Sequence, residues 1–118
     1  MYTCIKMHKN NMMDIYKLRV KLLHALTDKT RLEILSLLRH GEELCSCDLE
    51  KTIDKSQSTL SRHLKKLTEA DIISARKEGV KVLYKIKDPH IYKLIANIDN
   101  LIKRNEKFQK IVEIQTSI

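Results

Sequence analysis

The sequence predicts a mainly helical protein with one small β-hairpin, which is an α+β fold class. Apolar residues recur at steps of three and four over most of the chain, the spacing of one helix face. Residues 72–87, IISARKEGVKVLYKIK, instead alternate in the period of a strand. Two glycines and one proline in 118 residues leave few chain breaks, so long helices with short connections are expected.

Two helices are expected before the first glycine. The first covers residues 14–26, and its apolar face consists of Ile15, Leu18, Leu22 and Leu26. The second follows Asp28, whose carboxylate can accept hydrogen bonds from the unpaired amides of a helix start, and it ends at Gly41. Its sequence, RLEILSLLRH, is apolar enough to be buried on more than one side, so we expect it at the centre of the core.

A helix-turn-helix is expected next. A short third helix should cover residues 47–53, and a fourth should run from its N-cap Ser56 to about Ala70. The fourth helix directs Leu60, Leu64 and Leu67 to the core. Its opposite face is basic and exposed, so this helix can enter the major groove of DNA.

The exposed face of the fourth helix supplies the first set of candidate DNA contacts. Gln57 and Ser58 lie at its N-terminal end, where side chains can meet base edges, whereas Arg62, Lys65 and Lys66 suit phosphates. The full set, with the preceding turn and flanking positions, is Lys55, Ser56, Gln57, Ser58, Thr59, Ser61, Arg62, His63, Lys65 and Lys66.

The hairpin supplies a second basic element. Its turn is expected at Glu78 and Gly79, and Arg76, Lys77 and Lys81 surround that turn. Winged helix-turn-helix proteins use such a hairpin to reach along the sugar-phosphate backbone. Either basic element alone could be an ordinary solvated surface, but two in tandem favour nucleic acid as the partner.

A last helix is expected over residues 88–112, with Pro89 at a first helical position. Its heptad seam consists of Ile91, Leu94, Ile98, Leu101, Asn105, Phe108 and Val112. A seam this long exceeds what so small a domain could cover, so it predicts a homodimer interface whose register the polar Asn105 would fix. The alternative is a terminal helix packed on its own core.

Composition narrows the class of protein. Lys and Arg number 23 against 15 Asp and Glu, a formal charge of +8, which favours a polyanion or an anionic membrane surface as partner. No apolar run approaches the roughly 18 residues that cross a bilayer, so we expect a cytoplasmic protein and no membrane partner. We expect one domain over 1–118, with an N-terminal arm 1–13, a core 14–87 and a dimerisation helix 88–112. The sequence contains no glycine-rich phosphate loop and no grouping of nucleophile, base and acid, so it does not predict an enzyme.

The stretch ELCSCD places Cys45 and Cys47 directly before the helix-turn-helix. In a reducing compartment such cysteines are thiols, metal ligands or redox sensors more often than a disulfide framework. Residues i and i+2 of a regular helix point about 200° apart, so both sulfurs could bind one ion only if the start of the third helix were reshaped. That change could misplace the helix that reads DNA. Cys4 and His8 would share a face if their segment were helical.

Four motifs in this order, DKTRLEIL, ELCSCDL, SQSTLSRHLKKL and RKEGVKVLYKI, resemble the ArsR/SmtB family of metal-responsive repressors. The resemblance covers residues 23–86. It implies a homodimeric winged helix-turn-helix protein, dimerised through its first and last helices. Such a repressor holds double-stranded operator DNA and releases it when a metal ion or arsenite binds.

The resemblance also implies a ligand set. Cys45 and Cys47 would bind the inducer, and Cys4 with His8 could complete the site across the dimer. Arsenite sensors of the family often carry a third cysteine where this chain has Glu50. Three sulfurs would suit arsenite, and three sulfurs with one nitrogen would suit zinc, cadmium or lead.

Two alternatives accompany this ligand set. A second family site on the last helix is only half matched, by Asp88 and His90, because Leu101 and Arg104 stand at its later positions. We therefore interpret Asp88 as a helix cap and His90 as a surface residue. The alternative function is a redox-responsive repressor of the same fold, in which the thiols of the C-x-C motif oxidise without metal.

Overall fold

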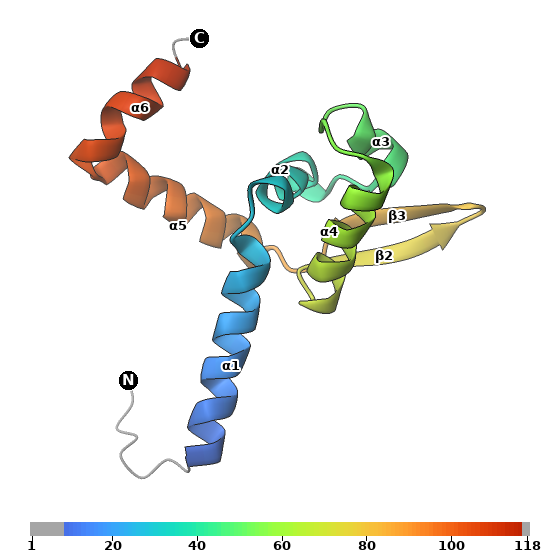
Figure 1. Cartoon of the computed structure of the whole chain (residues 1–118), viewed down its shortest axis with the longest axis horizontal. Helices are drawn as coiled ribbons and strands as arrows, with labels where there is room; N and C mark the ends of the chain where they lie inside the picture. The colour runs from blue at the N-terminus through green and yellow to red at the C-terminus, as the bar shows by residue number, and fades with distance from the viewer. Residues whose placement is uncertain (1–8, 117–118) are drawn as a thin grey trace. The chain divides into compact units, whose positions relative to one another are not determined.

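The computed structural model describes residues 9–116, which fall into two units divided after Lys87 and described separately here. The first unit contains α1 (Lys9–Leu26), α2 (Lys29–Leu37), a 3-10 turn (Arg39–Gly41), β1 (Leu44–Cys45), α3 (Ser46–Glu50), α4 (Gln57–Glu69), β2 (Ile73–Glu78) and β3 (Lys81–Ile86). The second contains α5 (His90–Arg104) and α6 (Glu106–Thr116) (Figure 1). No helix in this described range is both long and apolar enough to cross a membrane.

The core of the first unit forms where α4 packs against α2, α3 and the sheet. Leu60, Leu64 and Leu67 of α4 are at most 1% exposed, as the helical spacing predicted. Ile34 and Leu35 of α2 are equally buried, which confirms the central place predicted for that helix. Burying a side chain of this size contributes about 1.5–3 kcal/mol, so this interface fixes the orientation of α4.

Two predicted helix starts are confirmed by their caps. The Asp28 carboxylate accepts a hydrogen bond from the Arg31 backbone N–H at 3.1 Å, and the Ser56 hydroxyl accepts one from the Thr59 N–H at 3.2 Å. The end of α2 differs from the prediction. The α-helix stops at Leu37, and the following 3-10 turn places His40 at φ 63°, in the left-handed region, before Gly41 is reached.

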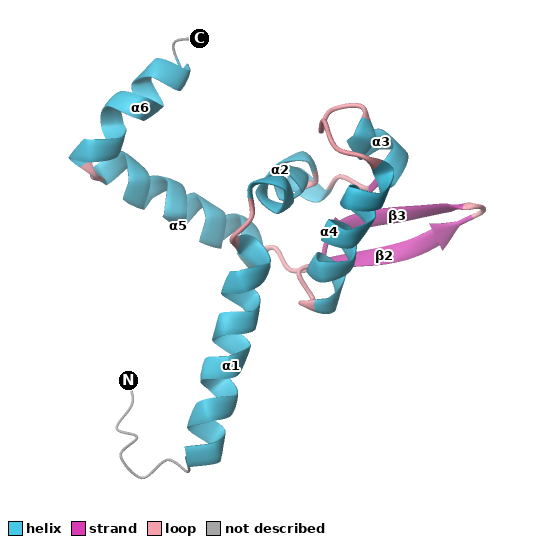
Figure 2. Ribbon diagram, in the orientation of Figure 1, coloured by secondary structure: helices cyan, strands magenta, loops and turns pink. Residues whose placement is uncertain are grey.

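The hairpin of β2 and β3 (Figure 2) is part of a three-stranded antiparallel sheet with the order β1-β3-β2. Glu78 pairs with Lys81, so Gly79 and Val80 form the turn, and Gly79 takes the positive φ of 64° that favours glycine. The third strand, β1, was not predicted. It pairs Leu44 with Tyr84, and thereby joins the segment before α3 to the hairpin.

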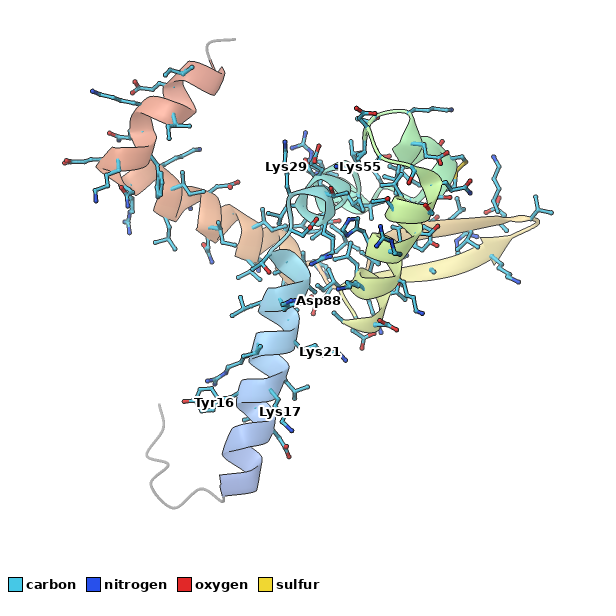
Figure 3. The ribbon with its side chains drawn as sticks, in the orientation of Figure 1. Tyr16, Lys17, Lys21, Lys29, Lys55 and Asp88 are labelled. Atoms are coloured by element: carbon cyan, nitrogen blue, oxygen red, sulfur yellow. A yellow bond between two sulfur atoms is a disulfide. The ribbon has the colours of Figure 1, made fainter. Side chains whose placement is uncertain are left out.

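Helix α1 is longer than predicted and leaves most of its apolar face exposed. Of the four residues predicted on that face, Leu26 is buried, whereas Ile15 is 37%, Leu18 65% and Leu22 36% exposed. Figure 1 shows α1 continuing well beyond its contact with α2. Apolar and basic side chains both project from α1, and Figure 3 labels Tyr16, Lys17 and Lys21 among them.

The second unit is not the continuous helix predicted for residues 88–112. Asn105 takes an extended conformation, φ −86° and ψ 116°, and separates α5 from α6. Its side-chain oxygen accepts a hydrogen bond from the Lys107 N–H at 2.9 Å, and its carbonyl accepts the Phe108 and Gln109 N–H groups. Asn105 is therefore a cap between two helices rather than a polar member of one uninterrupted seam.

The N-cap of α5 lies one residue later than predicted, because we expected it at Asp88. Pro89 occupies the N-cap, and the first helical residue is His90. The Asp88 carboxylate nevertheless accepts a hydrogen bond from the His90 backbone N–H at 2.9 Å, so its side chain serves the helix start as predicted. The His90 side chain is 80% exposed.

Candidate thiol site and DNA-binding surface

Cys45 lies at the junction of a strand and a helix. It is the last residue of β1 and the N-cap of α3, with an extended backbone and only 3% exposure. Its sulfur accepts a hydrogen bond from the Asp48 N–H at 3.3 Å, and the Asp48 carboxylate accepts one from the Cys45 N–H at 3.0 Å. This reciprocal capping box makes the sulfur of Cys45 part of what fixes the start of α3.

Cys47, the second residue of α3, is exposed, and its sulfur is joined to that of Cys45 in a disulfide. The Cα atoms are 5.2 Å apart. The expectation that the two sulfurs meet only if the helix is reshaped is wrong. Cys45 lies in extended backbone before the helix, so the helical rotation of 100° per residue does not separate the side chains. The sulfurs converge while α3 is intact.

Asp48 is the third member of this cluster, and the sequence analysis missed it. Ligand atoms of Cys45, Cys47 and Asp48 all lie within 4.8 Å of one another, and a carboxylate oxygen of Asp48 is 3.2 Å from the sulfur of Cys45. Its place three residues after an N-cap was the available signal. Glu50 is exposed at the end of α3 and is outside the cluster, whereas Cys4 and His8 lie outside the described residues.

The candidate DNA-binding side chains of α4 fall into two groups. Thr59 and His63 are partly buried, and the Thr59 hydroxyl accepts a hydrogen bond from Ser56 at 2.9 Å. Figure 3 labels Lys55 at the turn between α3 and α4. The exposed members are Lys55, Ser56, Gln57, Ser58, Ser61, Arg62, Lys65 and Lys66.

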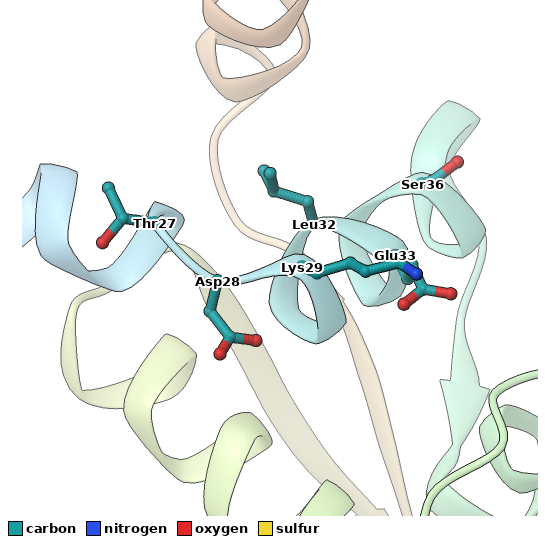
Figure 4. Close-up of a pocket in the computed structure, with 6 residues that line it drawn as sticks. All are labelled: Thr27, Asp28, Lys29, Leu32, Glu33 and Ser36. Atoms are coloured by element: carbon teal, nitrogen blue, oxygen red, sulfur yellow. The ribbon is translucent and has the colours of Figure 1, made fainter.

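His63 faces inward, toward the junction of α1 and α2. Its side chain is 18% exposed, and its Nδ1 lies 3.0 Å from a guanidinium nitrogen of Arg31. Burial lowers the pKa of His63 below its ordinary value, although the nearby Asp28 carboxylate opposes that effect. Asp28 and Leu32 both line a shallow depression at the start of α2, and Figure 4 shows their side chains pointing to opposite sides. The geometry suits a contact that orients α4 better than a contact with DNA.

Arg31 is the other half of this junction. It is only 5% exposed, and it donates hydrogen bonds to the Ala25 carbonyl at 2.7 Å and the His24 carbonyl at 3.2 Å. Both carbonyls belong to the last turn of α1. Together with the contact to His63, one guanidinium therefore joins α1, α2 and α4.

The three basic residues of the hairpin differ in their surroundings. Arg76 makes two hydrogen bonds to the Glu43 carboxylate, at 2.8 and 3.0 Å, and lies 2.9 Å from Glu78. The hydrogen bond from Arg76 lowers the pKa of the Glu43 carboxyl, so both groups stay ionised near neutral pH. Lys77 and Lys81 are exposed and form no ion pair with any part of the chain that the structure describes.

Comparisons with known proteins agree with this arrangement. Residues 28–75 match the family model described as bacterial regulatory protein, arsR family. An arsenical resistance operon repressor of Staphylococcus aureus is 38% identical over 92 residues, which cover 78% of this chain and 88% of that protein. A cadmium resistance transcriptional regulatory protein CadC homolog from the same species is 39% identical over 87 residues, 74% of this chain and 69% of that protein.

The fold has its own match among solved structures. A homodimeric winged helix-turn-helix DNA-binding domain from Mycobacterium bovis aligns with a TM-score of 0.74 at 22% identity. The alignment covers 84% of this chain and 91% of that one. At this identity the likeness bears on the fold alone, and it confirms the winged helix-turn-helix predicted from the basic helix and its hairpin.

Proposed function

This chain belongs to the arsR family of bacterial regulatory proteins, and on that premise we propose that it is a transcriptional repressor controlled through Cys45 and Cys47. It holds double-stranded operator DNA and releases it when a soft metal ion or arsenite binds the two sulfurs. The observation that carries the proposal is the position of Cys45. This residue caps α3, the first helix of the helix-turn-helix, and also pairs with strand β3 of the hairpin.

DNA binding is assigned to the exposed residues of α4 and of the hairpin. Gln57 and Ser58 at the N-terminal end of α4 would meet base edges, and Arg62 would meet phosphate. Lys77 and Lys81 extend the basic surface to the hairpin, where neither forms an ion pair within the described residues, although Glu78 stands opposite Lys81 in the register. This division predicts sequence preference from the first pair and salt-dependent affinity from the cations.

A homodimer would place two such surfaces on two operator half-sites. The exposed apolar side chains of α1, among them Ile15, Leu18 and Leu22, support this proposal, because a contiguous apolar patch on a protein surface usually marks an interaction site. Phe108 and Ile111 of α6 are 46% and 53% exposed and add to the apolar surface that a second copy could bury. The structurally similar domain from Mycobacterium bovis is itself homodimeric.

The thiol cluster suits a thiophilic ion once its disulfide is reduced. Two electrons and two protons from a thiol reductant would convert the disulfide to the free thiols of Cys45 and Cys47, which bind soft ions as thiolates. The carboxylate of Asp48 offers an oxygen ligand beside them. Two sulfurs and one oxygen fit zinc, cadmium or lead better than arsenite, which is suited by three sulfurs. Cys4 and His8 remain the proposed sources of further ligands, from the same chain or its partner.

The coupling between this cluster and DNA follows from the double role of its members. Cys45 and Asp48 form the capping box of α3, so their use as ligands would take hydrogen-bonding atoms away from that cap. An N-cap contributes about 1 kcal/mol to a helix, and α3 has only five residues, so its start depends on this cap. Because α3 packs against α4, a displaced α3 would misalign the DNA-reading face.

A redox-responsive repressor is the second candidate, and the disulfide between Cys45 and Cys47 favours it. Hydrogen peroxide would take two electrons and two protons from the two thiols, leaving the disulfide and two molecules of water. The capping box of α3 is intact in this disulfide form, so oxidation would have to change DNA binding by a route other than loss of that cap.

One titration distinguishes the two candidates. Operator binding by the reduced protein is measured in a gel shift against arsenite, cadmium, zinc, lead and peroxide, while absorbance in the thiolate charge-transfer region reports ion binding. We expect release by at least one ion together with that absorbance. Release by peroxide alone would establish the redox repressor, and no release by any of the five would refute control through the thiols.

A further inference from the structure

We propose that Arg76 is a positioning residue that ties the hairpin to the thiol segment through Glu43, and that it does not contact DNA phosphate. The proposal rests on the repressor function above. It adds a route by which a structural change at Cys45 and Cys47 would be transmitted to the hairpin of β2 and β3. It reassigns a residue that its basic side chain alone would group with Lys77 and Lys81.

The contact itself is bidentate. The Nε and one terminal nitrogen of Arg76 each donate to a different oxygen of the Glu43 carboxylate, at 2.8 and 3.0 Å. The remaining terminal nitrogen is 2.9 Å from Glu78. A planar guanidinium held on two sides by carboxylates has a fixed orientation, unlike a lysine ammonium on a flexible stem.

The position of Glu43 makes this contact a link rather than a local ion pair. Glu43 is separated from Arg76 by 33 residues but stands two residues before Cys45. In the sheet, Leu83 of β3 pairs with Cys45 on one side and with Arg76 on the other. A backbone shift at Cys45 would therefore reach the hairpin twice, through the ladder to Leu83 and through Glu43 to Arg76.

Charge explains why this arginine is a poor phosphate contact. Glu43, Arg76 and Glu78 carry one positive and two negative charges, so the cluster has a net charge of −1. A phosphate approaching Arg76 would have to displace one carboxylate and would be repelled by the other. Lys77, the next residue on β2, has no such competitor within the described chain, which makes it a matched control.

The first arm of the test compares salt dependence. Operator affinity of the reduced, metal-free protein is measured from low to moderate salt for the wild type, Arg76→Gln and Lys77→Gln. We expect Lys77→Gln to lower the salt slope by about one charge, and Arg76→Gln to leave the slope unchanged. A slope lowered equally in both variants would identify Arg76 as a phosphate contact and overturn the proposal.

The second arm measures coupling with cadmium ion as the probe. Glu43→Gln should bind cadmium with the wild-type affinity, judged by thiolate absorbance, while the ratio of operator affinities without and with cadmium falls by about fivefold, the lower end of usual allosteric couplings. Arg76→Lys, which keeps the charge but loses the two-point contact, should show the same loss. An unchanged ratio in both variants would refute the link, whereas a wild type that ignores cadmium would refute only the proposed induction by that ion.

A third arm needs no DNA. Amide hydrogen exchange in β1 and β3 of the free protein should rise in Glu43→Gln and Arg76→Lys but not in Lys77→Gln, because only the first two variants loosen the tie between the segments. Equal exchange in all three variants would contradict the proposal even if the wild type bound no operator.

Discussion

Replacement of Arg31 by methionine tests how the DNA-reading helix is held. The substitution keeps the length of the apolar stem and removes the guanidinium that joins the end of α1 to His63 on α4. The buried carbonyl of Ala25 and the Nδ1 of His63 would lose their partner. The structure therefore indicates that this variant destabilises the first unit.

The magnitude follows from the hydrogen bonds lost. Arg31 makes three, to Ala25, His24 and His63, and a hydrogen bond from a charged donor contributes about 1.5–3 kcal/mol. Relief from burying the guanidinium offsets several kcal/mol of that loss. We expect a net decrease of about 3 kcal/mol in the free energy of unfolding, comparable to the cost of about 1–3 kcal/mol for each buried polar group left without its partner.

Urea unfolding, followed by circular dichroism under reducing conditions, measures this change. With a slope of about 1.5 kcal/mol per molar urea, the midpoint should fall by about 2 M. Arg39→Met is the control, because Arg39 is exposed and an exposed substitution usually changes stability by less than about 0.5 kcal/mol. A midpoint for Arg31→Met equal to that of the control would refute the assigned role of Arg31.

Three further outcomes are expected. Because burial lowers the pKa of His63, the folded state favours the neutral ring. The free energy of unfolding should therefore be greatest above the ordinary pKa of 6.5 and decline as the pH falls below it. Urea titrations at pH 7 and pH 5 should show this decline in the wild type and not in His63→Gln. Arg62→Gln should weaken binding to operator and random duplex alike and lower the salt slope by about one charge, and a gel shift with an unchanged slope would remove Arg62 from the interface. Truncation after Pro89 should leave monomers with little operator affinity, and a tight dimer in sedimentation would move the interface elsewhere.

Local signals in the sequence were sufficient for much of the fold. Asp28 and Ser56 accept hydrogen bonds from amides three residues later, and such caps depend on neighbours close in sequence. The leucines of α4 and the alternation of the hairpin follow from helical and strand periods in the same way. The turn was expected at Glu78 and Gly79 and lies one residue later, at Gly79 and Val80, where Gly79 takes a positive φ that glycine adopts without strain.

The remaining features depend on partners far away in the chain. Strand β1 has two residues, too few for a period, and exists because Cys45 pairs with Leu83. His63 lies beside the core face of a helical wheel, three residues from Leu60 and four from Leu67, but a wheel cannot show that it meets Arg31, 32 residues earlier. The break at Asn105 interrupts a seam whose spacing is regular on both sides, so periodicity alone could not locate it.

The candidate site was predicted in part for the same reason. The sequence identified the thiols and their place before the helix-turn-helix, and the cluster also includes Asp48 through its capping contact with Cys45. Helical geometry was applied to Cys45 although that residue lies in a strand, which gave the wrong expectation that the sulfurs diverge. The assignment of Cys4 and His8 stays a prediction.

Operator affinity of the reduced protein, measured with and without a saturating soft ion for the wild type, Cys45→Ser and Cys47→Ser, tests the central claim most directly. Cadmium and arsenite are titrated separately in the same gel shift. The wild type should lose at least about tenfold in affinity with one of them, within the usual range of allosteric coupling. Both serine variants should bind operator as the ion-free wild type does and should not respond. Serine variants that still release DNA at the same ion concentration would contradict control through this thiol pair.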